Sequence, residues 1–189
     1  MIVGDPSSFA IESGITQAFA NPGQFALGYF IIHIRAKMHG VKEPDASLLA
    51  CSVDAVSDRL RRRGTHQAAN LSAFDATEIA QAYLDAFYRE TARADYFGLS
   101  HGEFSQALRR NSIVWAPDGD EAFDDGSHVL QFDVGSGVRL IGLVDTGSES
   151  DLAASIVEER VDADVFYDTL SRWSSLFAAE RAALLRSQR

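Results

Sequence analysis

The segment from residue 25 to residue 34 restricts the fold more than any other part of the chain. It reads Phe-Ala-Leu-Gly-Tyr-Phe-Ile-Ile-His-Ile and is the most apolar run in the sequence. It is too short to cross a membrane, which takes about 20 apolar residues. Its alternation instead predicts a strand over residues 26–36, with Phe30, Ile32 and Ile34 on the core face.

Two pairs of strands are predicted, one near each end of the chain. Residues 9–16 alternate loosely, and an Asn-Pro-Gly turn at residues 21–23 separates them from the apolar segment, so we expect an N-terminal hairpin. Near the other end, residues 127–133 and 137–145 are β-like runs around a Gly-Ser-Gly turn. A third run, residues 152–161, is expected to extend the C-terminal hairpin.

Helices are predicted where apolar residues recur every three or four positions. The clearest begins at Asp75, and a shorter one covers residues 102–110. The last helix starts at Asp162 or Asp164, either of which is a suitable N-cap, and residues 178–189 prolong it as a fraying tail. Its expected core side chains are Phe166, Leu170, Trp173 and Phe177.

Three consecutive arginines, at residues 61–63, precede Gly64 at the end of a further helical pattern. Cations are favoured in the last turn of a helix by its dipole, and glycine commonly follows that turn. A phosphate-binding patch is the alternative interpretation of these arginines. No aromatic or further basic residues cluster with them, which favours the dipole interpretation.

The predicted fold class is α+β. We expect an antiparallel sheet built from the N-terminal and C-terminal hairpins, packed against several helices that include the aromatic C-terminal helix. The sequence contains no internal repeat, low-complexity tract or Pro/Ser linker. Residues 1–189 are therefore expected to form a single domain, which at this length needs neither disulfides nor a metal to fold.

The known catalytic and cofactor motifs are not found in the sequence. It contains no Gly-x-Ser-x-Gly elbow, phosphate loop, Gly-x-Gly-x-x-Gly fingerprint, Cys-x-x-Cys pair or histidines four residues apart. The only cysteine, Cys51, has apolar neighbours and is predicted to be a buried core thiol rather than a nucleophile. We therefore predict no catalytic, metal-binding or cofactor-binding residue, and a protein that is not an enzyme.

The densest acidic segment, residues 118–125, has three interpretations. Asp118 and Asp120 fit the first and third positions of a calcium-binding loop, but Ala122 and Phe123 stand where a ligand and a glycine are needed. The segment is then a solvated loop, a contact surface for a basic partner, or a weak cation site.

The formal net charge of −10 limits the partners of the chain. Phosphate backbones repel such a surface, which argues against nucleic-acid binding. A basic protein would be attracted and steered towards it, although the acidity could also serve solubility alone. The start of the chain shows no secretory signal and no run long enough to span a membrane, so we expect a cytoplasmic protein.

The opening residues resemble those of one known family. Met1-Ile2-Val3-Gly4-Asp5-Pro6, followed by Phe9-Ala10-Ile11-Glu12, is similar to the start of the bacterial immunity protein 42 family. Those proteins continue with an aromatic-rich strand, here residues 27–32, and end near an aromatic helix, here around Phe166, Tyr167, Leu170 and Trp173. Residues 60–125 carry no part of the resemblance.

The resemblance implies an antidote in a polymorphic toxin system. Such a protein binds the C-terminal toxin domain delivered by neighbouring cells, or made in the same cell, and blocks it by stoichiometric occupancy. No catalytic residue is implied. The acidity suits a basic, nuclease-like toxin. An exposed aromatic stripe on the last helix would form a homo-oligomer, whereas a buried one would complete the core.

The first place to expect toxin contacts is the acidic segment with its aromatic neighbours. For Trp115, the alternative to a toxin contact is a position in the core. Three alternative functions stay open. The chain could be a cytosolic adaptor outside toxin systems, a small-molecule sensor, or an enzyme whose pocket gathers His33, His101 or His128 with carboxylates. The predicted contact residues are Asp118, Asp120, Glu121, Asp124, Asp125, Trp115 and Phe123.

Overall fold

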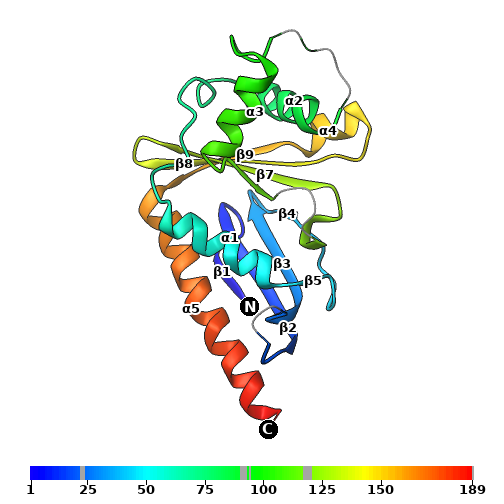
Figure 1. The fold of residues 1–189 in the computed structure, drawn as a ribbon, viewed down its shortest axis with the longest axis vertical. Coiled ribbons are helices and arrows are strands. Elements are labelled where there is room, and N and C mark those ends of the chain that lie inside the picture. Colours follow the sequence, from blue (N-terminus) through cyan, green and yellow to red (C-terminus); the bar gives the residue numbers. More distant parts are fainter. Residues whose placement is uncertain (22–23, 90–92, 94, 117–120, 189) are drawn as a thin grey trace.

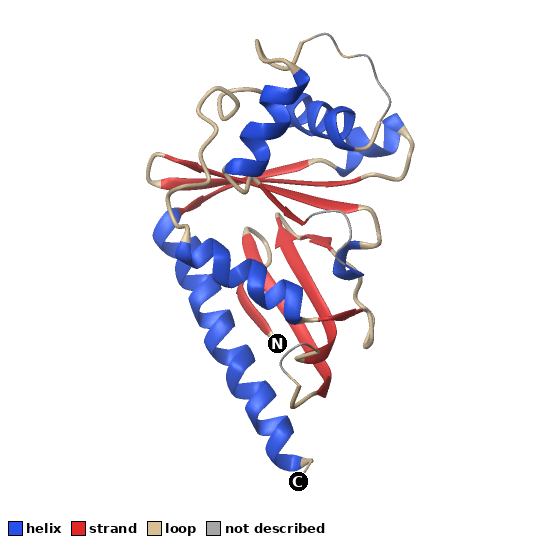
Figure 2. Cartoon of the chain, viewed as in Figure 1, coloured by secondary structure: helices blue, strands red, loops and turns tan. Residues whose placement is uncertain are grey.

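The chain folds as an α+β protein with two antiparallel sheets and helices around them (Figures 1 and 2). The computed structural model describes residues 1–21, 24–89, 93, 95–116 and 121–188. Within these residues, no helix combines the length and the apolar character needed to cross a bilayer. The α+β class predicted from the sequence is confirmed.

The first sheet contains the predicted N-terminal hairpin. Strand β2 (Phe9–Ala18) pairs with β3 (Ala26–Ile34), and Phe9 lies opposite Ile34. The outer positions are taken by β1 (Ile2–Asp5), β4 (Lys37–His39) and the short β5 (Ser47–Leu48). Both edges of the hairpin are thus closed by strands that lie close to it in the sequence.

The second sheet contains the predicted C-terminal hairpin and has the order β6-β7-β8-β9. These strands are β6 (Val114–Ala116), β7 (Ser127–Val134), β8 (Gly137–Val144) and β9 (Val157–Asp162). The two hairpins therefore lie in separate sheets. Each hairpin finds its edge partners among nearby strands, so neither is left with a long edge for the other.

The run at residues 152–161 is only partly a strand. Helix α4 (Glu149–Ser155) takes its first half, and β9 begins at Val157. Leu152 is buried on this helix, among the side chains that cover the second sheet. Burial of Leu152 on this helix favours the helical conformation in a segment whose own pattern is ambiguous.

The remaining helices lie in two groups around the second sheet. Helices α2 (Ala76–Phe87) and α3 (His101–Arg110) lie with α4 on one side, while α1 (Ala50–Arg61) and α5 (Ala163–Ser187) lie on the other, beside the first sheet (Figure 1). A short 3-10 helix, η1 (Glu121–Phe123), precedes β7.

The starts of helices α2 and α5 are set by N-cap residues that the sequence predicts. Asp75 accepts a hydrogen bond from the Thr77 N–H, as expected for the N-cap of α2. Asp162 caps α5 by accepting from the N–H groups of Asp164 and Val165, which decides between the two predicted caps. Such side chains satisfy N–H groups that have no partner within the helix. Residues 178–187 continue α5, so the predicted tail is helical through Ser187.

The second sheet is the middle layer of the molecule. Val129, Val138 and Leu140 join the core shared with the first sheet, while Phe132 and Ile141 join the core under α2 and α3. Because both faces of the second sheet are covered, the sequence of its strand β8 is a nearly continuous run of apolar residues. Where the two sheets meet, a Cβ at residue 142 would overlap the ring of His39, so Gly142 permits their close approach.

Helix α5 holds the first sheet through its aromatic stripe. Trp173 is 1% exposed, donates a hydrogen bond from Nε1 to Ser13 Oγ at 2.9 Å, and meets the Phe30 ring edge-on at 5.2 Å. Phe166, Leu170 and Phe177 are equally buried. The predicted core stripe is confirmed. Because it is buried, this stripe completes the core.

Candidate partner-binding surface

The histidines are spread across the fold. His33 lies beside Glu12, His101 donates to the Ala86 carbonyl at 2.9 Å, and His128 contacts the hydroxyl of Tyr83. Among the residues that the structure describes, no group of three or more histidine, cysteine or acidic side chains is arranged to hold a metal ion. These positions do not converge on one site.

Glu12 and His33 form the most suggestive acid–base pair, on a face of the first sheet. The Glu12 carboxylate lies 3.0 Å from His33 Nε2 and 2.7 Å from Lys42 Nζ. Burial raises the pKa of Glu12, but the hydrogen bonds from Lys42 and His33 outweigh it and hold that pKa below its usual value. A buried carboxylate kept ionised by two internal partners is a poor proton acceptor for a substrate.

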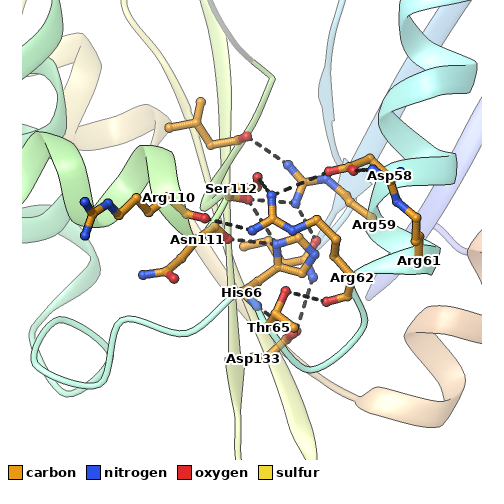
Figure 3. A network of polar contacts seen from close by, with 12 residues as sticks. Asp58, Arg59, Arg61, Arg62, Thr65, His66, Arg110, Asn111, Ser112 and Asp133 are labelled. Atoms are coloured by element: carbon orange, nitrogen blue, oxygen red, sulfur yellow. Dashed lines mark hydrogen bonds and ion pairs between the residues drawn. The ribbon is translucent and has the colours of Figure 1, made fainter.

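A buried polar network joins α1 to the middle sheet (Figure 3). Arg59 donates to Gln131 Oε1 at 3.0 Å, to the Ser112 carbonyl at 3.1 Å and to the Val114 carbonyl at 2.8 Å. Its guanidinium carbon lies 4.7 Å from the centre of the Trp115 ring. This network holds two layers together.

The three consecutive arginines bind the protein itself. Arg61 pairs with Asp58, Arg62 donates to Ser112 Oγ and the Arg110 carbonyl, and Arg63 pairs with Asp164. These contacts support the interpretation of a favourable last helical turn, with side chains engaged by neighbouring elements. They leave the phosphate-patch interpretation without support.

The predicted contact segment is only partly described. Asp118 and Asp120 lie outside the described residues. Glu121, Asp124 and Asp125 are exposed, and Asp125 accepts hydrogen bonds from the N–H and hydroxyl of Ser127 at 3.0 and 2.9 Å. These three carboxylates therefore face solvent around η1 and the start of β7.

The two aromatic residues proposed with this segment lie in the core. Trp115 is 2% exposed and packs between Phe9 and Phe166, at ring distances of 6.0 and 5.8 Å. Phe123 is 7% exposed and meets the Phe30 ring edge-on. Their large apolar rings are removed from water by the first sheet and α5, so they offer no surface to a partner. The core alternative for Trp115 is the one observed.

Two further carboxylates, which the sequence did not single out, extend the acidic surface. The Val41 N–H donates to the Ala122 carbonyl at 2.8 Å, so the loop that carries Glu43 and Asp45 runs beside η1. Both side chains are exposed. Tertiary contacts of this kind bring residues 43–45 to residues 121–125, and no local signal predicts them. We call Glu43, Asp45, Glu121, Asp124 and Asp125 the acidic surface.

The acidic surface is not neutralised by neighbouring cations. Within the described part of the chain, none of its five carboxylates forms an ion pair, and Lys42 is engaged by Glu12. The exposed Leu48, at 40%, follows Asp45 in the same connection. A surface with negative charge and some apolar area is suited to a basic protein partner.

Cys51 is exposed, which corrects the expectation of a buried thiol. It lies in the first turn of α1, where Ser52 and Val56 take the inward positions. Apolar neighbours in the sequence did not predict burial because the helix turns the cysteine to its outer face.

Comparisons with known proteins identify relatives of the chain. The model of the family described as immunity protein 42 matches residues 1–176. A search of curated proteins found no match. Among solved structures, the chain is similar to the crystal structure of CdiI from Burkholderia dolosa AUO158, with a TM-score of 0.58 and 16% identity over 93% of this chain and 99% of that chain. At this identity the likeness establishes a shared fold.

Proposed function

The chain belongs to the immunity protein 42 family and is an immunity protein of a toxin system, and from this premise we propose that it neutralises its cognate toxin by direct, stoichiometric binding. The observation that carries the proposal is the family match over residues 1–176. This range includes both sheets and the buried stripe of α5 as far as Trp173, so the similarity extends over the folded body rather than one motif.

Inhibition by occupancy is the mode of action that fits these side chains. The buried Glu12 and His33 bind each other, and the buried Arg59 donates to Gln131 and to two backbone carbonyls. The fold shared with CdiI supports a role against toxins that are delivered by cell contact. A protein of this kind meets its toxin in the cytoplasm, where a nuclease-like toxin would act.

The proposed contact area is the acidic surface, and the proposed toxin is basic. Five exposed carboxylates that form no ion pair within the described part of the chain would attract a positive partner and would speed encounter at low ionic strength. Nucleases present basic surfaces to bind phosphate backbones. An acidic inhibitor matches such a surface, and it would compete there with nucleic acid.

Co-expression with a toxin tests the proposal. The C-terminal domain of a large secreted protein encoded next to this chain is produced with and without it, and growth and co-purification are measured. We expect growth to be restored and a 1:1 complex to be recovered. An unrelated toxin domain serves as the specificity control. Continued growth arrest with an active toxin, and no complex, would refute neutralisation by binding.

A further inference from the structure

A pocket lies between the end of α2, the end of α3 and strand β6 of the second sheet. Its volume is about 440 Å³, within the usual range of about 300–1,000 Å³ for sites that bury a bound group. The pocket is lined by Tyr83, Phe87, Tyr88, Leu108, Arg109, Ser112 and Val114.

The lining is aromatic, with one cation at its side. The Tyr83 ring lies 5.3 Å from the Phe87 ring and 5.7 Å from the Tyr88 ring. The guanidinium carbon of Arg109 lies 5.0 Å from the centre of the Phe87 ring, and Arg109 makes no ion pair with any residue that the structure describes. Tyr88 is 37% exposed, so the pocket presents aromatic surface to solvent.

The pocket and the acidic surface are connected through the start of β7. The Tyr88 ring lies 5.0 Å from the ring of His128, and the preceding residue, Ser127, holds the Asp125 carboxylate. A second link runs through Asp145, which pairs with Arg89 at 3.3 Å and donates its N–H to the Gly126 carbonyl at 2.9 Å. The aromatic pocket and the Asp125 carboxylate are thus both joined to the start of β7.

We propose that this pocket is the anchor site of the toxin interface and receives one aromatic side chain of the toxin, flanked by lysine or arginine. This inference rests on the proposed function. A few aromatic and arginine contacts, surrounded by a polar rim, supply most of the binding energy of protein interfaces. Here Phe87, Tyr88 and Arg109 are the anchor residues, and Asp124 and Asp125 belong to the rim.

Charge selects an aromatic occupant over a charged one. A lysine or arginine inserted into the pocket would meet Arg109, and an acidic side chain would be repelled by the net negative charge of the chain. An aromatic ring carries no net charge, packs against Phe87 and Tyr88, and stacks on a guanidinium. Basic residues on either side of the ring would then face the acidic rim.

Binding of a catalytically inactive form of the adjacent-gene toxin domain tests the inference. We expect Tyr88→Ala and Arg109→Ala each to weaken binding 10- to 100-fold, and Tyr88→Phe, which keeps the ring, to bind within about threefold of the wild type. Matched controls are Arg110→Ala, whose side chain points away from the polar network in Figure 3, and Leu176→Ala, an exposed residue of α5; both should bind as the wild type does. Thermal unfolding verifies that every variant is folded.

A photo-crosslinker at position 88 identifies the occupant. Tyr88→benzoylphenylalanine is irradiated in the complex, and mass spectrometry locates the attached toxin residue, which should lie within a few positions of an aromatic residue flanked by basic ones. Two outcomes would overturn this inference and leave the proposed function standing. One is attachment of the crosslinker to an acidic segment of the toxin, and the other is unchanged toxin affinity in folded Tyr88→Ala and Arg109→Ala. Failure of the wild-type chain to bind would overturn the proposed function and this inference together.

Discussion

Arg59 is a single residue on which the contact between α1 and the middle sheet depends. It is 4% exposed, and burial lowers its pKa to about 9, so the guanidinium is still charged at neutral pH. Three oxygen acceptors from Ser112, Val114 and Gln131 receive its hydrogen bonds. A buried charge is tolerated when it is hydrogen-bonded in this way.

Replacing Arg59 with methionine keeps most of the side-chain volume but removes every donor. We expect Arg59→Met to lower the free energy of unfolding by about 3 kcal/mol, because buried acceptors that lose their donor cost about 1–3 kcal/mol each. Urea unfolding, read as a shift of the midpoint at constant slope, measures the change. Arg61→Met, at an exposed position, should change it by less than about 0.5 kcal/mol. Equal midpoints for the two variants would contradict this account.

His39 gives the stability of the protein a defined dependence on pH. Burial lowers its pKa from 6.5 to about 4, although the Asp125 carboxylate acts in the opposite direction. The unfolded chain therefore binds this proton at a higher pH than the folded chain does. The stability contributed by neutral His39 is fully present above pH 6.5 and is lost as the pH falls towards 4.

The His39→Leu variant isolates that contribution. Between pH 7 and pH 4 the wild type should lose about 3 kcal/mol more stability than the variant, since each unit of pKa difference corresponds to about 1.4 kcal/mol. Chemical unfolding of both proteins across this range measures the difference, and the other titrating groups cancel in the comparison. Parallel pH profiles would show that His39 does not titrate differently in the folded state.

Helix α5 is the element that the first sheet depends on most. Its N-terminus is capped by Asp162, and its inward stripe places Trp173 between Phe30 and Phe177. The burial of Trp173 and its hydrogen bond to Ser13 connect residues far apart in the sequence. Without this helix the aromatic face of β2 and β3 would be open to water.

Truncating Trp173 tests that dependence. We expect Trp173→Ala to cost about 3–5 kcal/mol, the usual range for removing a large buried aromatic side chain. The melting temperature and the urea midpoint should both fall. Leu176→Ala, on the outer face of the same helix and 48% exposed, is the matched control and should change stability by only a few tenths of a kcal/mol. A Trp173→Ala loss as small as the control's would place Trp173 outside the core.

Elements with a strong local signal were predictable, and those decided by tertiary contacts were not. The stripe of α5, the cap at Asp75 and both central hairpins follow from spacing and turn chemistry. Strand β1 and the helical half of residues 152–161 were missed because their conformations depend on neighbours distant in the sequence. The capping box of Ser100 and Glu103 was a local signal that could have placed the start of α3.

At the scale of the whole molecule, the contact surface was only partly predictable. Glu121, Asp124 and Asp125 stand out in the sequence as a dense acidic run, and the structure leaves them exposed. Trp115 and Phe123 have the same sequence neighbourhood but are directed inwards by the packing of the two sheets. Sequence distance cannot show which members of a segment share a surface.

The total charge and its placement make separate contributions to toxin association. Removing three carboxylates anywhere reduces the overall attraction between an acidic inhibitor and a basic toxin, but only removal at the interface changes the local field that orients the encounter. We expect the triple variant Glu43→Gln, Glu121→Gln and Asp124→Asn to associate about tenfold more slowly at low salt, with a nearly unchanged dissociation rate and melting temperature. Stopped-flow binding at several ionic strengths measures the rates.

A control with the same change in net charge separates the two contributions. Glu78→Gln, Asp151→Asn and Asp168→Asn neutralise three exposed carboxylates away from the acidic surface. Both triple variants carry the same total charge, so any difference in association rate is due to placement. At about 0.1 M salt the control should associate within about twofold of the wild type, because charges more than about 10 Å from the contact are then screened. Equal slowing in the two variants would mean that the toxin responds only to overall charge and that the acidic surface lies outside the interface.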